Sequence, residues 1–231
     1  MRTFQAKKPS ENVIDIFTRQ PVANQDSRKV IRLAPELDGL EMLYSNDSNP
    51  NKLFSMKILC WALRANGEVV AMVPWLNDIV SCDELNDPLN GHWEGYYDAG
   101  IDEIFFEAPL HKIVELESSA EYYEASFEKA DDVVHEIPDN IGTHAIITYN
   151  NFASFSLVEV VSWRLLHNGR IHAMLIDDNK VESTPVLPGD PCLFAAQNHP
   201  GFKYFFHHRI ANKIKSNDPE AMAAFSLLVD T

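Results

Sequence analysis

The chain is poor in glycine and cysteine, and both shortages restrict its chemistry. Nine glycines in 231 residues include neither a G-x-G-x-x-G nor a G-x-x-x-x-G-K-[ST] pattern, which disfavours the usual nucleotide-binding loops. The three cysteines, Cys60, Cys82 and Cys192, are widely spaced and form no C-x-x-C. This usage predicts neither a disulfide framework nor a zinc knuckle.

Long apolar runs are also missing. No stretch approaches the roughly 18 apolar residues that a membrane-spanning helix requires, and the first 30 residues or so lack the apolar core and cleavage site of a secretory signal. We therefore expect a cytoplasmic protein without a membrane partner.

Basic residues are scarce outside the first part of the chain. The formal net charge is −15, yet residues 1–33 hold seven Lys and Arg against three acidic residues. A surface that binds a polyanion needs clustered cations, so the remaining acidic body predicts no nucleic-acid partner. We interpret residues 1–33 as a basic, loosely ordered leader.

Motifs of covalent or metal-dependent catalysis give no lead. The sequence has no G-x-S-x-G and no H-E-x-x-H, the patterns of a nucleophile elbow and of a helical zinc site. We predict no metal and no cofactor.

The clearest positive feature is an internal repeat. Residues 60–73 align without a gap on residues 162–175, and Trp, Leu, Asn, Gly, Ala and Met coincide. A window of this length should give about one identity by chance. The alignment continues less regularly, for example from Pro35 to Pro138 and from Phe105-Phe106 to Phe205-Phe206.

This alignment predicts two tandem units, 34–130 and 134–231, with an acidic junction between them. We expect an α+β fold in which two pseudo-two-fold-related, strand-rich units of about 100 residues each carry a hairpin and a C-terminal helix. The expected helices cover residues 119–134 and 219–228. The expected strands include residues 41–45, 145–149 and 104–107.

Two Asn-Gly pairs, at 66–67 and 168–169, predict equivalent turns. Asn-Gly suits both positive-φ positions of a two-residue type I′ hairpin. A helix ending at Gly67 is the alternative, since residues 52–65 are rich in Leu, Met, Lys and Ala. We favour the hairpin, with Trp61 and Trp163 packed in the core.

Histidines gather in the second half and supply the weak catalytic candidates. His172, Asp178 and His199 could form a base with its orienting carboxylate or ligate a metal. Their spacing matches no known ligand pattern, and a structural role for these histidines is the simpler interpretation.

Two aromatic segments supply the ligand-binding candidates. Trp93, Tyr96 and Tyr97 lie at a place that matches Phe202 and Tyr204, and such rings could line a groove at the boundary between the units. Ordinary core packing is the alternative.

These patterns do not define a reaction. The leading hypothesis is a non-catalytic cytoplasmic binding or adaptor protein that uses the seam between the units, with a protein or small molecule as partner. The alternative is a small hydrolase or metal-dependent enzyme with its site in the second unit. A pocket with converging polar groups would favour the enzyme, and a flat or apolar surface would favour the adaptor.

Overall fold

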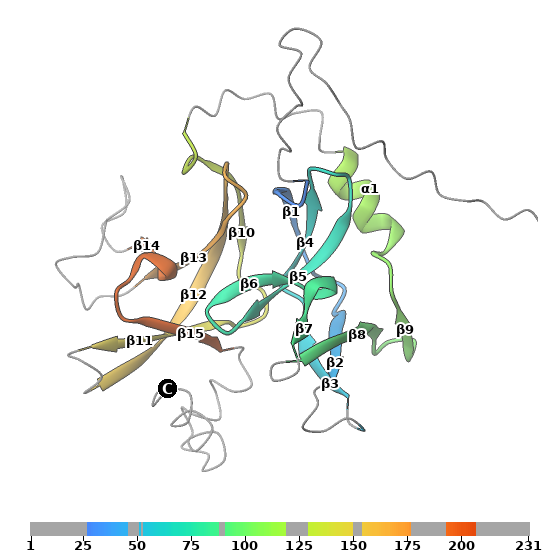
Figure 1. Ribbon diagram of the computed structural model, residues 1–231, viewed down its shortest axis with the longest axis horizontal. Coiled ribbons are helices and arrows are strands. Elements are labelled where there is room, and N and C mark those ends of the chain that lie inside the picture. The colour runs from blue at the N-terminus through green and yellow to red at the C-terminus, as the bar shows by residue number, and fades with distance from the viewer. Residues whose placement is uncertain are drawn as a thin grey trace, which may run out of the picture.

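Strands dominate the structure, and the expected α+β class is wrong. The computed structural model describes residues 27–45, 51, 53–87, 91–118, 129–149, 154–176 and 193–206 (Figure 1). It is 57% strand against 11% helix, in three sheets. The single α-helix of the described residues, α1 (Leu110–Ser118), follows the first set of strands, and the described residues of the second set contain no α-helix.

The first set of strands forms two sheets. The order in one is β1-β4-β5-β6, and in the other β3-β2-β8-β7 with β9 added to β8. The strands are β1 (Val30–Pro35), β2 (Glu41–Ser45), β3 (Phe54–Lys57), β4 (Cys60–Arg64), β5 (Val69–Trp75), β6 (Asp78–Ser81), β7 (Asn86–Asp87), β8 (Gly91–Asp98) and β9 (Glu103–Phe105), and the 3₁₀ helix η1 (Cys82–Glu84) follows β6.

The second set forms one sheet of order β14-β13-β12-β11-β15, with β10 also paired to β12. The long strand β12 pairs with β10 and β13 along one part and with β11 along the other. The elements are β10 (Val133–Pro138), β11 (His144–Tyr149), β12 (Ser154–Leu166), β13 (Ile171–Ile176), β14 (Leu193–Ala195), η3 (Ala196–Asn198) and β15 (Phe202–Phe206). Figure 1 shows the two sets side by side, with α1 beside the first.

Both sets pair their strands in the same register. Ala34 lies opposite Trp61, and Ile137 lies opposite Trp163. The next pairs correspond as well, since Trp61 faces Ala71 as Trp163 faces Ala173. An irregularity interrupts β1 between Val30 and Arg32 and interrupts β10 between Val133 and His135. Two residues, one from each set, are called corresponding when they occupy the same position in this pairing of strands.

Each set is built around one buried tryptophan whose indole N–H donates to a carboxylate. Trp61 Nε1 donates to Glu36 Oε2 at 2.6 Å, and Trp163 Nε1 donates to Asp139 Oδ1 at 2.9 Å. Both indoles are 0% exposed, as predicted for core residues. The other oxygen of each carboxylate accepts backbone N–H groups of the following turn.

The Asn-Gly pairs form hairpin turns, but of a different type from the one predicted. Gly67 and Gly169 have φ of 86° and 87°, whereas neither asparagine has a positive φ. Gly67 N donates to Arg64 O, and Arg64 N donates to Glu68 O. This is a three-residue loop, a type I turn followed by a left-handed glycine, so only glycine needs positive φ.

Other predicted elements have different bounds or lie outside the described residues. The strands predicted at residues 41–45, 145–149 and 104–107 are found as β2, β11 and, one residue earlier, β9. Residues 119–128 and 219–228, expected to be helical, lie outside the described residues, and β10 occupies 133–138.

The aromatic alignment is also corrected. Tyr96 pairs with Met42 in the first set, and Phe205 pairs with the corresponding Ala145 in the second. Phe205 therefore corresponds to Tyr96 and not to Phe105. The sequence alignment failed there because the connections after β5 and β13 differ in length.

The two sets share a continuous core. Val30, Leu33 and Leu59 of the first set belong to one buried apolar cluster with Ile137, Trp163 and other residues of the second. Strand β1 lies beside β10, and Phe205 N donates to Leu76 O at 2.7 Å across the junction. We call this junction the seam. The division into units 34–130 and 134–231 stays a prediction. Strand β1 crosses the predicted start of the first unit, because it begins at Val30.

Candidate functional site

Three adjoining cavities form a groove that crosses the seam. The first cavity, of about 470 Å³, lies within the first set and is lined by Arg64, Trp75 and Glu84 among others. The second, of about 490 Å³, lies within the second set. The seam cavity, of about 610 Å³, is lined by both sets and shares Arg28 and Asp78 with the first cavity. It shares Asn168, Arg170, His172 and Gln197 with the second.

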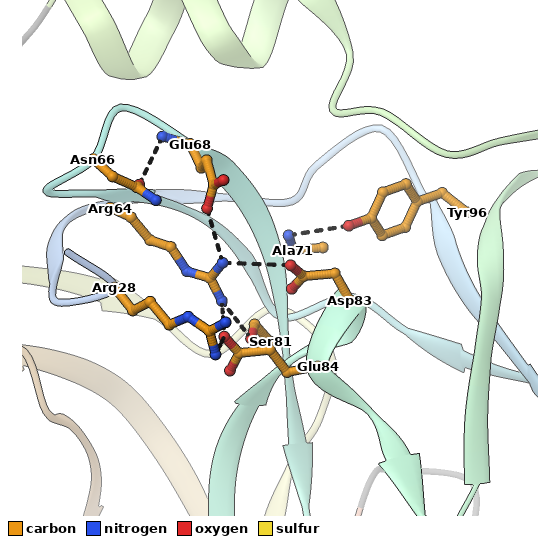
Figure 2. A network of polar contacts seen from close by, with 9 residues as sticks. All are labelled: Arg28, Arg64, Asn66, Glu68, Ala71, Ser81, Asp83, Glu84 and Tyr96. Carbon is orange, nitrogen blue, oxygen red and sulfur yellow. Dashed lines mark hydrogen bonds and ion pairs between the residues drawn. The ribbon is translucent and has the colours of Figure 1, made fainter. Parts of the chain in front are cut away.

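A buried arginine fills one wall of the first cavity. The Arg64 side chain, 4% exposed, leaves the end of β4 and points toward η1, as Figure 2 shows. Its Nη1 lies 3.3 Å from both Glu68 and Asp83. Its Nη2 donates to Ser81 Oγ at 2.7 Å and to Glu84 Oε1 at 2.8 Å. The Glu84 oxygen also accepts from Arg28 Nη1 at 3.0 Å.

Carboxylates of this cluster compensate the charge of Arg64. Three carboxylates surround Arg64, and hydrogen bonds from Asn66 and Arg64 lower the pKa of Glu68 below its ordinary value. Buried arginine is stable only when its N–H groups are satisfied in this way. The first cavity therefore holds a structural ion cluster with little capacity left for a ligand.

The second cavity has the same position in its set but carries different charged groups. Arg64 and Glu68 correspond to Leu166 and Arg170, because Leu166 N donates to Arg170 O as Arg64 N donates to Glu68 O. Pairing of β5 with β6 and of β13 with β14 places Gln197 where Asp83 stands. The second set thus has a guanidinium in place of Glu68 and an amide in place of Asp83, and its cavity contains one carboxylate, Asp131.

Cations from both sets meet in the seam cavity. Its lining contains Arg28, Lys29 and Arg170 but one carboxylate, Asp78. A β-carbon on Gly169 would lie 2.7 Å from Lys29 Cγ, so the lysine stem packs against the turn that carries Arg170. Among the described residues, no carboxylate lies within ion-pair distance of Lys29 or Arg170.

The amide side chains of the cavity are used by the protein itself. Gln197 Oε1 accepts from Ala173 N and its Nε2 donates to Ile171 O. Asn168 Oδ1 accepts from Arg170 N. Asp78 Oδ1 accepts from Ile79 N. The cavity is therefore richer in available donors than in acceptors.

His172 lines both the seam cavity and the second cavity. It lies on β13 opposite Arg164 of β12, whose Nε donates to Glu136 at 2.9 Å. Burial and the nearby Arg170 lower the pKa of His172 below its ordinary value, with Asp131 acting in the other direction. The imidazole is consequently neutral at pH 7.

The described catalytic candidates, His172 and His199, do not line a common cavity. His199 is buried, stacks near Phe194, and accepts from Gly201 N through Nδ1 at 3.0 Å. It does not line the cavities that contain His172. Asp178 lies outside the described residues. Of the described candidates, His172 lies at the groove and His199 lies away from it.

The aromatic candidates lie away from the groove. Tyr96 packs on Trp61 with ring centroids 5.0 Å apart, and Trp93 packs on Tyr96 at 5.2 Å. The Tyr97 hydroxyl donates to Asp102 Oδ1 at 2.8 Å, and this bond raises the pKa of Tyr97. Phe202 packs on Phe205 at 4.7 Å, and Tyr204 is partly exposed on β15. None of the five lines the three cavities of the groove.

Sequence reasoning missed the basic groups of the groove. Arg28 and Lys29 were assigned to a loosely ordered leader, yet the Lys29 and Ser27 carbonyls accept from Ala65 N and Asn66 N. Arg170 was not singled out. The available signal was the exchange of Glu68 for Arg170 inside the best-aligned segment of the repeat.

Metal and membrane sites find no support in the described part of the chain. No three His, Cys, Asp or Glu side chains gather there in a way that could hold a metal ion. Its helix is too short and too polar to cross a bilayer. Cys60 and Cys82 are buried free thiols, and burial raises the pKa of both.

Comparisons with known proteins leave the groove as the main functional lead. No family model, no curated protein and no solved structure matches this chain.

Proposed function

We propose that this chain is a binding protein whose ligand occupies the groove across the seam. The observation that carries the proposal is the seam cavity, in which side chains of both sets converge on one space. Its volume of about 610 Å³ falls in the range of roughly 300 to 1,000 Å³ typical of small-molecule sites.

The chemistry of the lining favours binding over catalysis. Lys29, Arg170 and His172 offer donors, but no nucleophile paired with a base lines the cavity among the described residues. Acid–base catalysis needs such groups within hydrogen-bond reach of one another. A ligand site fits the groove better than an active site.

A groove-blocking variant tests the proposal. Asn77 is exposed in the turn between β5 and β6 and lines the seam cavity, so Asn77→Trp places an indole at its mouth. Ala99→Trp, in the exposed turn between β8 and β9 away from the groove, is the matched control. Thermal unfolding is measured with a panel of small phosphates, carboxylates, amines, sugars and nucleosides.

We expect at least one compound to raise the Tm of the wild type and of Ala99→Trp, because a ligand that binds the native state stabilises it. The same compound should leave the Tm of Asn77→Trp unchanged. A panel without any stabilising compound, or equal stabilisation of all three proteins, would overturn the proposal.

A further inference from the structure

We propose that the seam cavity binds a small anion carrying phosphate or carboxylate groups, with Lys29 and Arg170 as its main ligands. This inference rests on the proposed function and names the class of ligand. It starts from charge, because Lys29 and Arg170 line the cavity together with one carboxylate, Asp78, and with Arg28, which is paired with Glu84.

The contrast between corresponding cavities supports it. In the first cavity the Arg64 guanidinium donates to carboxylates and to Ser81, all of the same set. In the second set Arg170 stands where Glu68 does, and Gln197 stands where Asp83 does. The first cavity therefore pairs its buried guanidinium with carboxylates, whereas Arg170 makes no ion pair with any described residue, although the Asp131 carboxylate also lines the second cavity.

Proximity of like charges gives a second reason. The Lys29 stem packs against the Gly169 turn next to Arg170. Burial and, after it, the field of Arg170 lower the pKa of His172, against an opposing effect of Asp131. Gathering cations in this way is unfavourable for the free protein. A bound anion would replace this repulsion by attraction. A guanidinium can hold a carboxylate or phosphate through two parallel hydrogen bonds.

The size and surroundings of the site limit the ligand to a small one. A cavity of about 610 Å³ accepts a compact ligand. A long polyanion would extend over the acidic remainder of the chain and be repelled. The ligand class is therefore a small organic or inorganic anion.

Calorimetric titration of the full chain tests this assignment. Pyrophosphate probes phosphate binding, citrate probes carboxylate binding, and glucose is the uncharged probe. Lys29→Gln and Arg170→Gln each remove one cation, while Lys57→Gln removes a cation of β3 outside the groove. Arg170→Lys retains charge at position 170 and shows whether a loss reflects charge or folding.

We expect pyrophosphate, citrate or both to bind, and the active anion identifies the preferred group. Lys29→Gln and Arg170→Gln should each weaken binding about tenfold, equivalent to about 1.4 kcal/mol. Arg170→Lys should lose less, and Lys57→Gln should match the wild type. In a parallel NMR titration, the saturating anion should raise the pKa of His172.

Three results would overturn the inference: no binding of either anion, equal losses in Lys57→Gln, or no loss in the two groove variants. If an uncharged compound binds in a way that Asn77→Trp abolishes while both anions fail, the ligand is not anionic but the proposed function stands. If nothing binds the groove, both fail.

Discussion

At the scale of single residues, the two carboxylate–indole pairs explain why an acidic chain buries Glu36 and leaves Asp139 only partly exposed. Glu36 accepts from Trp61 and from the backbone N–H groups of Asp38 and Leu40. Donors that water cannot reach must find an acceptor in the protein. These acids therefore belong to the fold and not to a catalytic site.

Glu36→Ala should lower the free energy of unfolding by about 2 to 3 kcal/mol, because it leaves a buried indole N–H and two backbone donors without an acceptor. Denaturant titration followed by tryptophan fluorescence measures the loss. Glu117→Ala, at an exposed position of α1, is the control and should change stability by less than about 0.5 kcal/mol. Equal effects of the two substitutions would contradict this interpretation.

Arg64 is the second residue whose role the structure defines. Arg64→Ala removes the cation that Glu68, Asp83 and Glu84 share. Since these carboxylates are partly exposed and can be rehydrated, we expect a loss of about 2 kcal/mol, below the roughly 3 to 5 kcal/mol for a fully buried pair.

Arg64→Leu, which places the residue of position 166 at the corresponding site, should lose less because it refills the apolar volume. Urea unfolding compares the three proteins. A change below about 0.5 kcal/mol for the alanine variant would show that the cluster does not stabilise the fold.

At the scale of elements, the sequence predicted what local chemistry decides. Residues 41–45 and 145–149 were recognised as strands from their own composition, and glycine at 67 and 169 marked two hairpins. Helix α1 was missed, although Pro109 directly precedes it and Pro is common at the start of a helix. In the structure, the Pro109 carbonyl accepts from Lys112 N and Ile113 N. Strand β10 begins at Val133, inside the helix predicted for residues 119–134. Its pairing with β12 outweighs the local preference of these residues.

The two hairpin glycines provide a matched experiment. Both have φ near +87°, where an L-residue is strained by about 1 kcal/mol. A β-carbon at Gly67 would meet nothing within 4 Å, whereas one at Gly169 would lie 2.7 Å from Lys29 Cγ and 3.3 Å from the Val30 backbone. Gly169→Ala should therefore destabilise the protein more than Gly67→Ala in thermal unfolding. The reverse order would place the two halves differently from the structure described here.

At the scale of the whole molecule, the groove could not have been predicted from the sequence. It requires Lys29, from a segment interpreted as a leader, to meet Arg170, from a turn more than a hundred residues away. Composition located the basic residues, but nothing in the local pattern indicated that residues 27–29 dock on the body through the hairpin backbones. Long-range packing decides that contact, and the repeat was visible because it preserves local pairing.

The seam also makes a prediction for the molecule in acid. His135 of β10 lies close to Arg32 of β1, and burial together with that guanidinium lowers its pKa below the ordinary 6.5. The pKa of His172 is lowered in the same direction. Below about pH 6.5 the unfolded chain binds protons that the native state resists. Stability should therefore fall as the pH drops from 7.5 to 5.5.

The double variant His135→Gln/His172→Gln should flatten this decline, because it removes both groups that bind fewer protons in the native state. Unfolding free energies at pH 7.5, 6.5 and 5.5 provide the measurement. His111→Gln is the control. His111 is an exposed residue of α1 that lies 2.8 Å from Asp38 and outside the seam, so its loss should leave the decline unchanged. A wild-type curve without a decline, or a double variant with the wild-type slope, would show that these half-buried histidines do not make the seam sensitive to acid.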